Sequence, residues 1–244
     1  MKNIIVLPLA ELLSRLAQHF VSVVTQQVAE KGGCFIALTG GNTCRPFYQL
    51  LATPMYSQQV PWDKVHVFLT DERISPPELA GSNFQTVWDF LLRHVPIAAD
   101  KIYRVVTKGV NAVESARLYS KQMQHVLEFS QQQSLDWVLL GLGEDGHVAS
   151  LFPGNPILHS TESYADASYS EKLASWRVSM TYTSLLKAKE INLLVTGLKK
   201  QNILKKLLQE DSAIYPVSRI MQEHQNCLWF IDQEARKFLN DNGI

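Results

Sequence analysis

The sequence predicts an α/β protein with a Rossmann-like fold, in which helices cover both faces of a mostly parallel central sheet. Three observations support this fold class. Short runs of β-branched and other apolar residues alternate with amphipathic stretches along the whole chain. Most of these runs are almost wholly apolar, as expected for strands that are covered on both faces. The repeated order of strand and then helix indicates parallel neighbours, because parallel strands need crossover connections.

The predicted strands are the short apolar runs, which are rich in valine, isoleucine and leucine. In chain order they are CFIAL (34–38), KVHVFL (64–69), KIYRVV (101–106), DWVLL (136–140), WRVSM (176–180), INLLV (191–195) and CLWFI (227–231). The predicted helices are the amphipathic stretches between them, at 9–30, 82–93, 112–132, 183–189, 199–209 and 233–240. A further helix is expected after Pro46. Ser82 is expected to cap the helix that begins near Asn83.

The length and the charge balance limit the function. A chain of 244 residues can bury a large core, and without an internal repeat or a Pro/Gly/Ser-rich linker it is expected to form one domain, 1–244. The 23 Lys and Arg residues balance 23 Asp and Glu residues. No global positive field is therefore expected to attract nucleic acid or an anionic membrane. A small anion would need a local cluster of cations.

The cysteines and the N-terminal segment indicate a cytoplasmic protein. Cys34, Cys44 and Cys227 are odd in number, lie far apart and lack the C-x-x-C spacing of a zinc or redox motif. The apolar run near the N-terminus is interrupted by Glu11 and Arg15 and lacks a cleavage site. No apolar run approaches the roughly 18 residues of a spanning helix. We expect a soluble, unprocessed protein.

Four polar motifs follow predicted strands. TGGNT (39–43), TDER (70–73), GLGEDGH (141–147) and TGLKK (196–200) each begin where a strand ends. In open α/β sheets, ligands bind outside the carboxyl ends of the strands. The topology alone therefore brings the four motifs to one edge of the sheet.

The TGGNT motif offers consecutive backbone N–H groups from Gly40 and Gly41, followed by Thr43 and a helix. Such a turn suits a phosphate, because its N–H groups form an anion nest at a helix N-terminus. The alternative is an ordinary strand-to-helix turn in which glycine serves only a positive φ. The motif alone does not separate these two interpretations.

The TDER motif places two carboxylates and a guanidinium at one strand end. Its functional interpretation has Asp71 holding sugar hydroxyls and Arg73 stabilising a developing oxyanion. The alternative is a solvated ionic turn.

Two further cations are candidates for anion binding. Arg177 lies in the strand-like RVSMT, and Lys200 lies at the start of a predicted helix, where a cation is disfavoured unless an anion is near. The two can complete a phosphate site, arginine by its fork and lysine as a point charge. The adjacent Lys199 keeps plain surface charge as the alternative.

The motif GLGEDGH contains G-x-G-x-x-G but does not fit a dinucleotide site. The segment 153–156 brings two prolines and a glycine where a long helix should run, and no strand with an acidic end follows. What remains is His147 two residues after Asp145, on a glycine-made turn. A histidine beside a carboxylate suits proton transfer near neutral pH, although a lone histidine is more often structural.

Other catalytic classes lack their motifs. The nucleophile elbow G-x-S-x-G does not occur, so Ser150 has no activating turn. The spacing H-E-x-x-H and clustered Cys/His sets are absent as well. The sequence therefore favours a water molecule activated by His147, without a metal.

Taken together, TGGNT, TDERISPPELAGSN, LLGLGEDGHVASLFPG, RVSMT, VTGLKK and CLWFIDQEA resemble the 6-phosphogluconolactonase family of the glucosamine-6-phosphate isomerase/deaminase-like superfamily. The resemblance runs from about residue 34 to 240. It implies a fold of the sugar-phosphate isomerase type and hydrolysis of 6-phospho-D-glucono-1,5-lactone to 6-phosphogluconate in the pentose phosphate pathway, without a cofactor.

The resemblance also implies roles for particular residues. His147 corresponds to the proposed general base, and Asp145 and Arg73 would complete the catalytic set at the lactone end. The expected substrate and phosphate-binding set is Gly40, Gly41, Asn42, Thr43, Asp71, Arg177 and Lys200.

Four positions depart from the usual family pattern. Asn42 and Cys44 replace Ser and Pro in the glycine loop, Val148 replaces Thr after the histidine, and the LN that follows the RVTLT-like strand appears here as Leu185-Leu186. The glycine loop and the helix after residue 181 are therefore expected to contact the substrate differently.

Two alternatives to the lactonase remain. An amino-sugar deaminase of the same superfamily would carry DEY and DGHIAFNEP, whereas this chain has DER and DGHVASLFP. A silent sugar-phosphate sensor would usually carry a DNA-binding module or a basic patch, and neither is visible. The expected partner is the small substrate alone, with the chain as a monomer or a small homo-oligomer.

Overall fold

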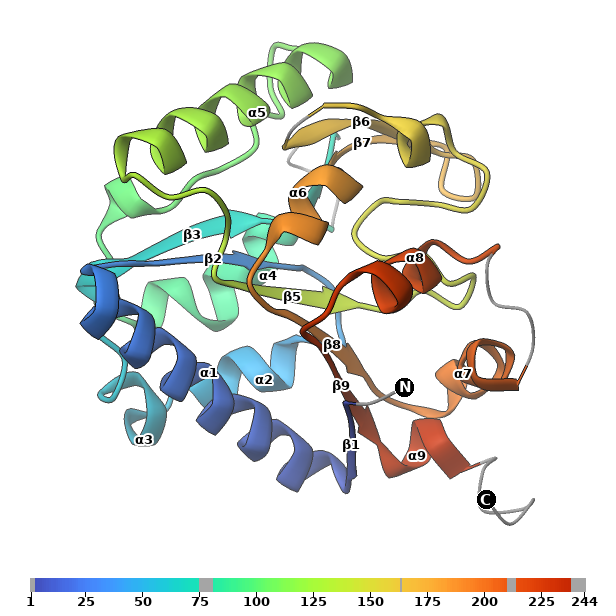
Figure 1. Ribbon diagram of the computed structural model, residues 1–244, viewed down its shortest axis with the longest axis horizontal. Helices are drawn as coiled ribbons and strands as arrows, with labels where there is room; N and C mark the ends of the chain where they lie inside the picture. The colour runs from blue at the N-terminus through green and yellow to red at the C-terminus, as the bar shows by residue number, and fades with distance from the viewer. Residues whose placement is uncertain (1–2, 75–80, 163, 210–213, 238–244) are drawn as a thin grey trace.

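A six-stranded parallel sheet forms the centre of the protein (Figure 1). The computed structural model describes residues 3–74, 81–162, 164–209 and 214–237. The strands of the sheet are β1 (Ile4–Leu7), β2 (Cys34–Leu38), β3 (Val65–Leu69), β5 (Trp137–Gly141), β8 (Ile191–Val195) and β9 (Cys227–Asp232). Their order is β1-β9-β8-β5-β2-β3, and every pairing is parallel. The predicted fold class is confirmed.

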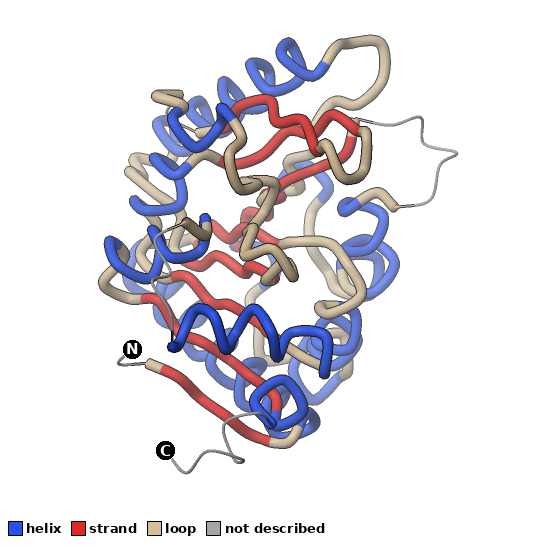
Figure 2. The backbone as a smooth tube through the Cα atoms, turned by 90° about the vertical axis from the view of Figure 1, so that its right-hand side faces the viewer, coloured by secondary structure: helices blue, strands red, loops and turns tan. Residues whose placement is uncertain are grey.

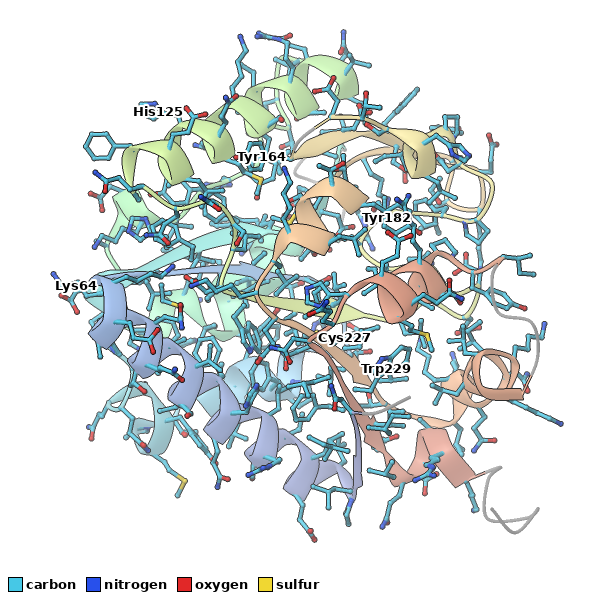
Figure 3. All side chains as sticks on the ribbon, viewed as in Figure 1. Lys64, His125, Tyr164, Tyr182, Cys227 and Trp229 are labelled. Atoms are coloured by element: carbon cyan, nitrogen blue, oxygen red, sulfur yellow. The ribbon has the colours of Figure 1, made fainter. Side chains whose placement is uncertain are left out.

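Helices cover both faces of this sheet (Figure 1). The helices are α1 (Leu9–Lys31), α2 (Arg45–Leu51), α3 (Pro54–Ser57), α4 (Asn83–Phe90), α5 (Ala112–Phe129), α6 (Tyr182–Lys187), α7 (Gln201–Gln209), α8 (Pro216–Glu223) and α9 (Gln233–Arg236). Helices α1 to α4 pack on one face, and α5 to α8 pack on the other. Tyr182, labelled in Figure 3, ties α6 to α8 because its hydroxyl donates to the carbonyl of Pro216 at 2.7 Å.

Alternate residues of each central strand pack into two hydrophobic cores, one on each face of the sheet. In β2, Phe35 and Ala37 belong to the core under α5 to α8, whereas Ile36 and Leu38 belong to the core under α1 to α4. All five residues of β2 are buried. The period of two explains why a strand that is covered on both faces is apolar throughout.

A second sheet of three antiparallel strands lies beside the first. It contains β4 (Asp71–Arg73), β6 (Ala165–Ser170) and β7 (Ser175–Met180) in the order β4-β7-β6. Figure 2 shows β6 and β7 at the top, as a layer apart from the main sheet. Only Thr70 separates β3 from β4, so the chain passes directly from one sheet to the other.

The strand order creates a crevice. Strand β2 lies between β3, which follows it in the chain, and β5, from which the order continues outward through β8, β9 and β1. The loops after β2 and β5 therefore leave the sheet at the point where the direction of winding reverses. In doubly wound sheets this point is where ligands bind.

The predicted strand at 101–106 is wrong. Residues Ala99–Lys101 form a 3₁₀ turn, and Ile102 makes only an isolated parallel bridge to Val67 of the edge strand β3. Arg104 and Val106 are exposed. The segment therefore lacks the two covered faces that its apolar residues suggested.

The small sheet was only partly predicted. The predicted strand 176–180 exists as β7, but it belongs to the antiparallel sheet and not to the central one. Its partner β6 was missed, because the sequence ADASYS is made largely of small and polar residues. The short strands β1 and β4 and the helix α8 were missed as well.

Several helix ends differ from the predictions for identifiable reasons. The helix predicted at 112–132 ends at Phe129, and Gln131 takes a positive φ of 54°. Ser82 caps α4 as predicted, accepting the backbone N–H of Gln85 at 3.1 Å. Of the helix predicted at 233–240, α9 covers Gln233–Arg236, and residues 238–240 lie outside the described residues.

Candidate active site

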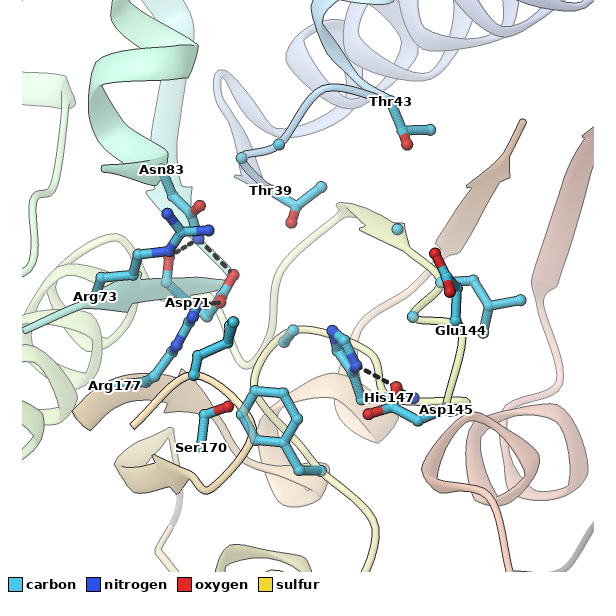
Figure 4. Close-up of a pocket in the computed structure, with 18 of the residues that line it drawn as sticks. Thr39, Thr43, Asp71, Arg73, Asn83, Glu144, Asp145, His147, Ser170 and Arg177 are labelled. Atoms are coloured by element: carbon cyan, nitrogen blue, oxygen red, sulfur yellow. Dashed lines mark hydrogen bonds and ion pairs between the residues drawn. The ribbon is translucent and has the colours of Figure 1, made fainter. Parts of the chain in front are cut away.

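A cavity of about 320 Å³ opens at the carboxyl edge of the parallel strands. The loops after β2 and β5 line it, and so does the small sheet with β4 and β7 (Figure 4). Its lining residues are Thr39, Gly40, Gly41, Thr43, Cys44, Asp71, Arg73, Asn83, Gly141, Leu142, Gly143, Glu144, Asp145, His147, Ala149, Phe152, Ser170, Lys172, Leu173, Arg177 and Lys200. Every residue that the sequence singled out for the site is among them, except Asn42.

The glycine loop brings backbone to the cavity wall. Gly41 has a φ of 93°, which favours glycine. A Cβ on Gly40 would lie 2.1 Å from the side-chain oxygen of Asn83, so a side chain there would displace that amide. Thr43 lines the cavity too. Asn42 is exposed and is not among the lining residues, so its side chain is left out of the function proposed below.

Asp71 serves as a buried anchor. The residue is 4% exposed, and its two carboxylate oxygens accept the Ser150 hydroxyl at 2.7 Å and the Asn83 amide N–H at 2.8 Å. The guanidinium of Arg177 lies 3.9 Å away. The sequence interpretation had Asp71 holding sugar hydroxyls, whereas these contacts use its oxygens to hold protein groups at the cavity wall.

Glu72 fastens the start of α4 to the small sheet. Its buried carboxylate accepts the backbone N–H groups of Arg73 at 2.7 Å, Asn83 at 2.9 Å and Phe84 at 2.8 Å. The hydroxyl of Ser82 donates to it at 2.9 Å. Burial raises the pKa of Glu72, and these hydrogen bonds act in the opposite direction. The carboxylate thus ties Arg73 of β4 to the N-terminal end of α4.

Two arginines stand side by side at the cavity. Arg73 of β4 and Arg177 of β7 are directly opposed in the antiparallel ladder. Burial lowers the pKa of Arg177, Asp71 raises it and Arg73 lowers it. The Nε atoms of both arginines are buried without a hydrogen-bond partner among the described residues. Since like charges directly opposite destabilise a sheet, this pair is suited to an anion.

His147 and Asp145 form a close pair on the loop after β5. Their Nδ1 and Oδ1 atoms are 2.5 Å apart, and the backbone N–H of His147 also donates to Oδ1 at 3.3 Å (Figure 4). A Cβ on Gly143 would lie 2.1 Å from Nδ1, so a residue with a side chain there would push the imidazole away. Because Nδ1 is engaged by Asp145, the other ring nitrogen, Nε2, is available for proton transfer.

The pKa of Asp145 is lowered to about 2. Burial acts to raise it, but the hydrogen bond and the charge of His147 outweigh burial. The carboxylate is therefore ionised near neutral pH. About a third of each side chain is exposed, with 32% for His147 and 38% for Asp145, so the pair is open to a ligand and to water.

Lys200 lies in a 3₁₀ turn, Leu198–Lys200, just before α7. Burial lowers its pKa, Glu144 and Asp145 raise it, and Lys172 and Lys199 lower it. The charges around Lys200 thus belong to the His147 loop and to the β6–β7 hairpin, whereas those around Arg177 belong to β4. The sequence expected the two cations to share one site, and the structure places both at one cavity with different neighbours.

Several lining residues lie outside the motifs that predicted the site. Ser170, Lys172 and Leu173 come from the β6–β7 hairpin, and Phe152 lies with its ring centroid 4.7 Å from that of His147. The hairpin residues were missed together with β6. The alternation of ADASYS before the polar turn EKLA was the signal that could have found them.

No group of three or more His, Cys, Asp and Glu side chains that could hold a metal ion occurs among the described residues. Within the same ranges, every helix is too short or too polar to cross a membrane.

A doubly wound sheet with a His–Asp pair and several cations in one cavity at its carboxyl edge defines an α/β enzyme suited to a small anionic substrate. The chain belongs to the family described as Glucosamine-6-phosphate isomerases/6-phosphogluconolactonase, whose profile matches residues 9–229. The family resemblance noted in the sequence is confirmed, and the chain is an enzyme of this family.

Relatives with known names cover most of the chain. A protein of Oryza sativa subsp. indica named "Probable 6-phosphogluconolactonase 3, chloroplastic" is 34% identical over 242 residues, which are 94% of this chain and 73% of the relative. A 6-phosphogluconolactonase of Synechocystis sp. is 33% identical over 216 residues, which are 87% of each chain. The solved structure of 6-phosphogluconolactonase from Trypanosoma cruzi has a TM-score of 0.83 at 27% identity and covers 98% of this chain and 97% of its own.

Proposed function

We propose that the protein hydrolyses 6-phospho-D-glucono-1,5-lactone to 6-phospho-D-gluconate in the oxidative branch of the pentose phosphate pathway, with a water molecule activated by His147 and without a metal. The observation that carries this proposal is the His147–Asp145 pair, which shares one cavity with four cationic side chains. The named relatives support the substrate, since they are 6-phosphogluconolactonases.

The cavity walls supply the binding part of the proposal. Backbone of Gly40 and Gly41, the side chain of Thr43 and the cations Arg177 and Lys200 hold the phosphate. This grip positions the lactone ring against the histidine, and positioning by a remote group is a large source of rate enhancement. Asp71 acts on this step through the Arg177 guanidinium that it faces.

The chemistry uses one proton carrier. Nε2 of His147 takes a proton from water while the water oxygen forms a bond to C1 of the lactone. Asp145 orients the ring and stabilises the imidazolium, and Arg73 stabilises the oxyanion. The bond from C1 to the ring oxygen then breaks, and the imidazolium returns its proton to that oxygen. The product carboxylic acid loses a proton to the solvent.

The direct test is an acid-release assay. The lactone is generated freshly with glucose-6-phosphate dehydrogenase, and acid release is compared with and without the purified protein. We expect release well above the spontaneous rate. In a parallel tube with glucosamine 6-phosphate, ammonia would point to the deaminase instead. Acid release at the spontaneous rate in the first tube would refute the proposal.

The proposal extends to the setting of the enzyme. We propose a single-domain cytoplasmic protein, acting as a monomer or a small homo-oligomer on a small-molecule substrate, with no nucleic acid or membrane partner. The three cysteines, which are free and buried, support a reducing compartment.

A further inference from the structure

The turn of the β6–β7 hairpin carries a cation that the mechanism above does not use. Lys172 lies in this turn and lines the same cavity as Lys200. We propose that Lys172 binds the phosphate of the substrate together with Lys200, and that Ser170 at the end of β6 adds a hydroxyl contact. This inference rests on the function proposed above and names a further binding segment for it.

The hairpin is fixed at the cavity by its pairing. Ser170 and Ser175 form the last pair of the β6–β7 ladder, and the backbone N–H of Ala174 donates to the Glu171 carbonyl at 3.2 Å, which closes the turn. Strand β7 then pairs with β4 through Arg177 and Arg73. One continuous ladder therefore positions both Lys172 and the arginine pair.

The two lysines are available for an anion. Among the described residues, neither Lys172 nor Lys200 has a carboxylate within 4.0 Å of its ammonium group. The positive charge of Lys172 lowers the pKa of Lys200, so the two ammonium groups repel each other. A phosphate monoester carries a charge of about −2 at neutral pH and would relieve this repulsion. Lysine suits this task as a mobile point charge.

Ser170 gives an independent indication of a ligand on the same hairpin. Its side chain is 1% exposed and lines the cavity, and its Oγ has no hydrogen-bond partner among the described residues. A buried hydroxyl without a partner is costly, so its partner is expected to arrive with the ligand. Figure 4 shows Ser170 on the same side of the cavity as Arg177.

The first test compares Lys172→Ala with Lys199→Ala. Lys199 precedes Lys200 but does not line the cavity, so its variant is a charge-matched control. We expect Lys172→Ala to raise KM for the phosphorylated lactone about 10-fold, since it removes one charge-assisted contact, while kcat stays within about 3-fold. Lys172→Arg should restore KM to within about 3-fold. With unphosphorylated gluconolactone, wild type and Lys172→Ala should be equal.

The second test measures binding without turnover. Calorimetric titration with 6-phosphogluconate should give a Kd about 10-fold weaker for Lys172→Ala and about 3-fold weaker for Ser170→Ala, and gluconate should show no such difference. An unchanged KM and Kd in Lys172→Ala would overturn the inference. If the wild type binds 6-phosphogluconate but does not hydrolyse the lactone, the proposed function fails, and the Kd of Lys172→Ala still decides the inference.

Discussion

At the scale of single residues, the site depends on one short loop. The 2.5 Å contact between His147 and Asp145 forms within three residues, because the turn between them contains Gly146 with a φ of 77°. Gly143 leaves room for the imidazole. Since the loop itself builds the pair, the sequence signal GEDGH was strong enough to find it.

The division of labour between His147 and Arg177 can be tested by substitution. We expect His147→Ala to lower kcat by roughly 10²-fold or more with a nearly unchanged KM, because it removes the proton carrier. Arg177→Ala should mainly raise KM, because it removes a phosphate contact. His125→Ala, on the exposed face of α5, is the control and should behave as wild type. Steady-state kinetics that show equal loss of kcat in the first two variants would contradict this division.

Cys44 lines the cavity, yet its thiol is expected to be inert. Burial raises its pKa to about 12, so at neutral pH only about one molecule in 10⁵ carries the thiolate. We expect iodoacetamide at pH 7 to leave activity unchanged over hours, whereas all three cysteines should react in urea, as measured by mass spectrometry. Rapid inactivation that Cys44→Ala abolishes would show that the thiol is accessible.

At the scale of elements, the junction between β4 and α4 depends on the carboxylate of Glu72, which accepts four hydrogen bonds there. In Glu72→Gln, an NH₂ group faces donors that the carboxylate accepted. We expect a loss of about 3 kcal/mol in the free energy of unfolding, measured by urea denaturation. Glu114→Gln on α5, whose exposed side chain pairs with Arg117, should cost less than about 1 kcal/mol. Equal losses in the two variants would contradict the role of Glu72.

The elements also show which parts of the fold were predictable. The central strands were found because residues such as Val138 and Leu193 lie in apolar runs covered on both faces. The small sheet was largely missed, because β4 has only three residues and β6 consists largely of small and polar residues. Its ladder also joins segments about 100 residues apart, such as Arg73 and Arg177, and local patterns do not report such pairing.

The candidate site, like the fold, was predicted where it depends on the parallel sheet and missed where it depends on the small sheet. Residues on the loops after β2 and β5, such as Gly40 and His147, were placed at the cavity by the topology of the parallel sheet. Asn42 lies on the same loop but is exposed and does not line the cavity, because a motif does not fix the direction of each side chain. Lys172 was missed because its hairpin was missed. The catalytic and binding roles themselves stay predictions.

At the scale of the whole molecule, two hydrophobic cores share one sheet. Leu139 of β5 and Leu193 of β8 are both fully buried, but they lie on opposite faces. If the chain is one domain, Leu139→Ala and Leu193→Ala should each lower the free energy of unfolding by about 2–5 kcal/mol. Each variant should still unfold in a single transition. Circular dichroism and tryptophan fluorescence should report the same midpoint. Two separate transitions, each sensitive to one variant, would divide the chain into two units.

Because the chain passes directly from β3 into β4, the site residues are divided between two sheets. The small sheet carries Arg73, Arg177 and Ser170, with Lys172 in its hairpin turn, whereas His147, the proposed proton carrier, lies on the loop after the parallel strand β5. Mutations confined to the small sheet would therefore change part of the proposed anion-binding set and leave the loop that carries His147 unaltered.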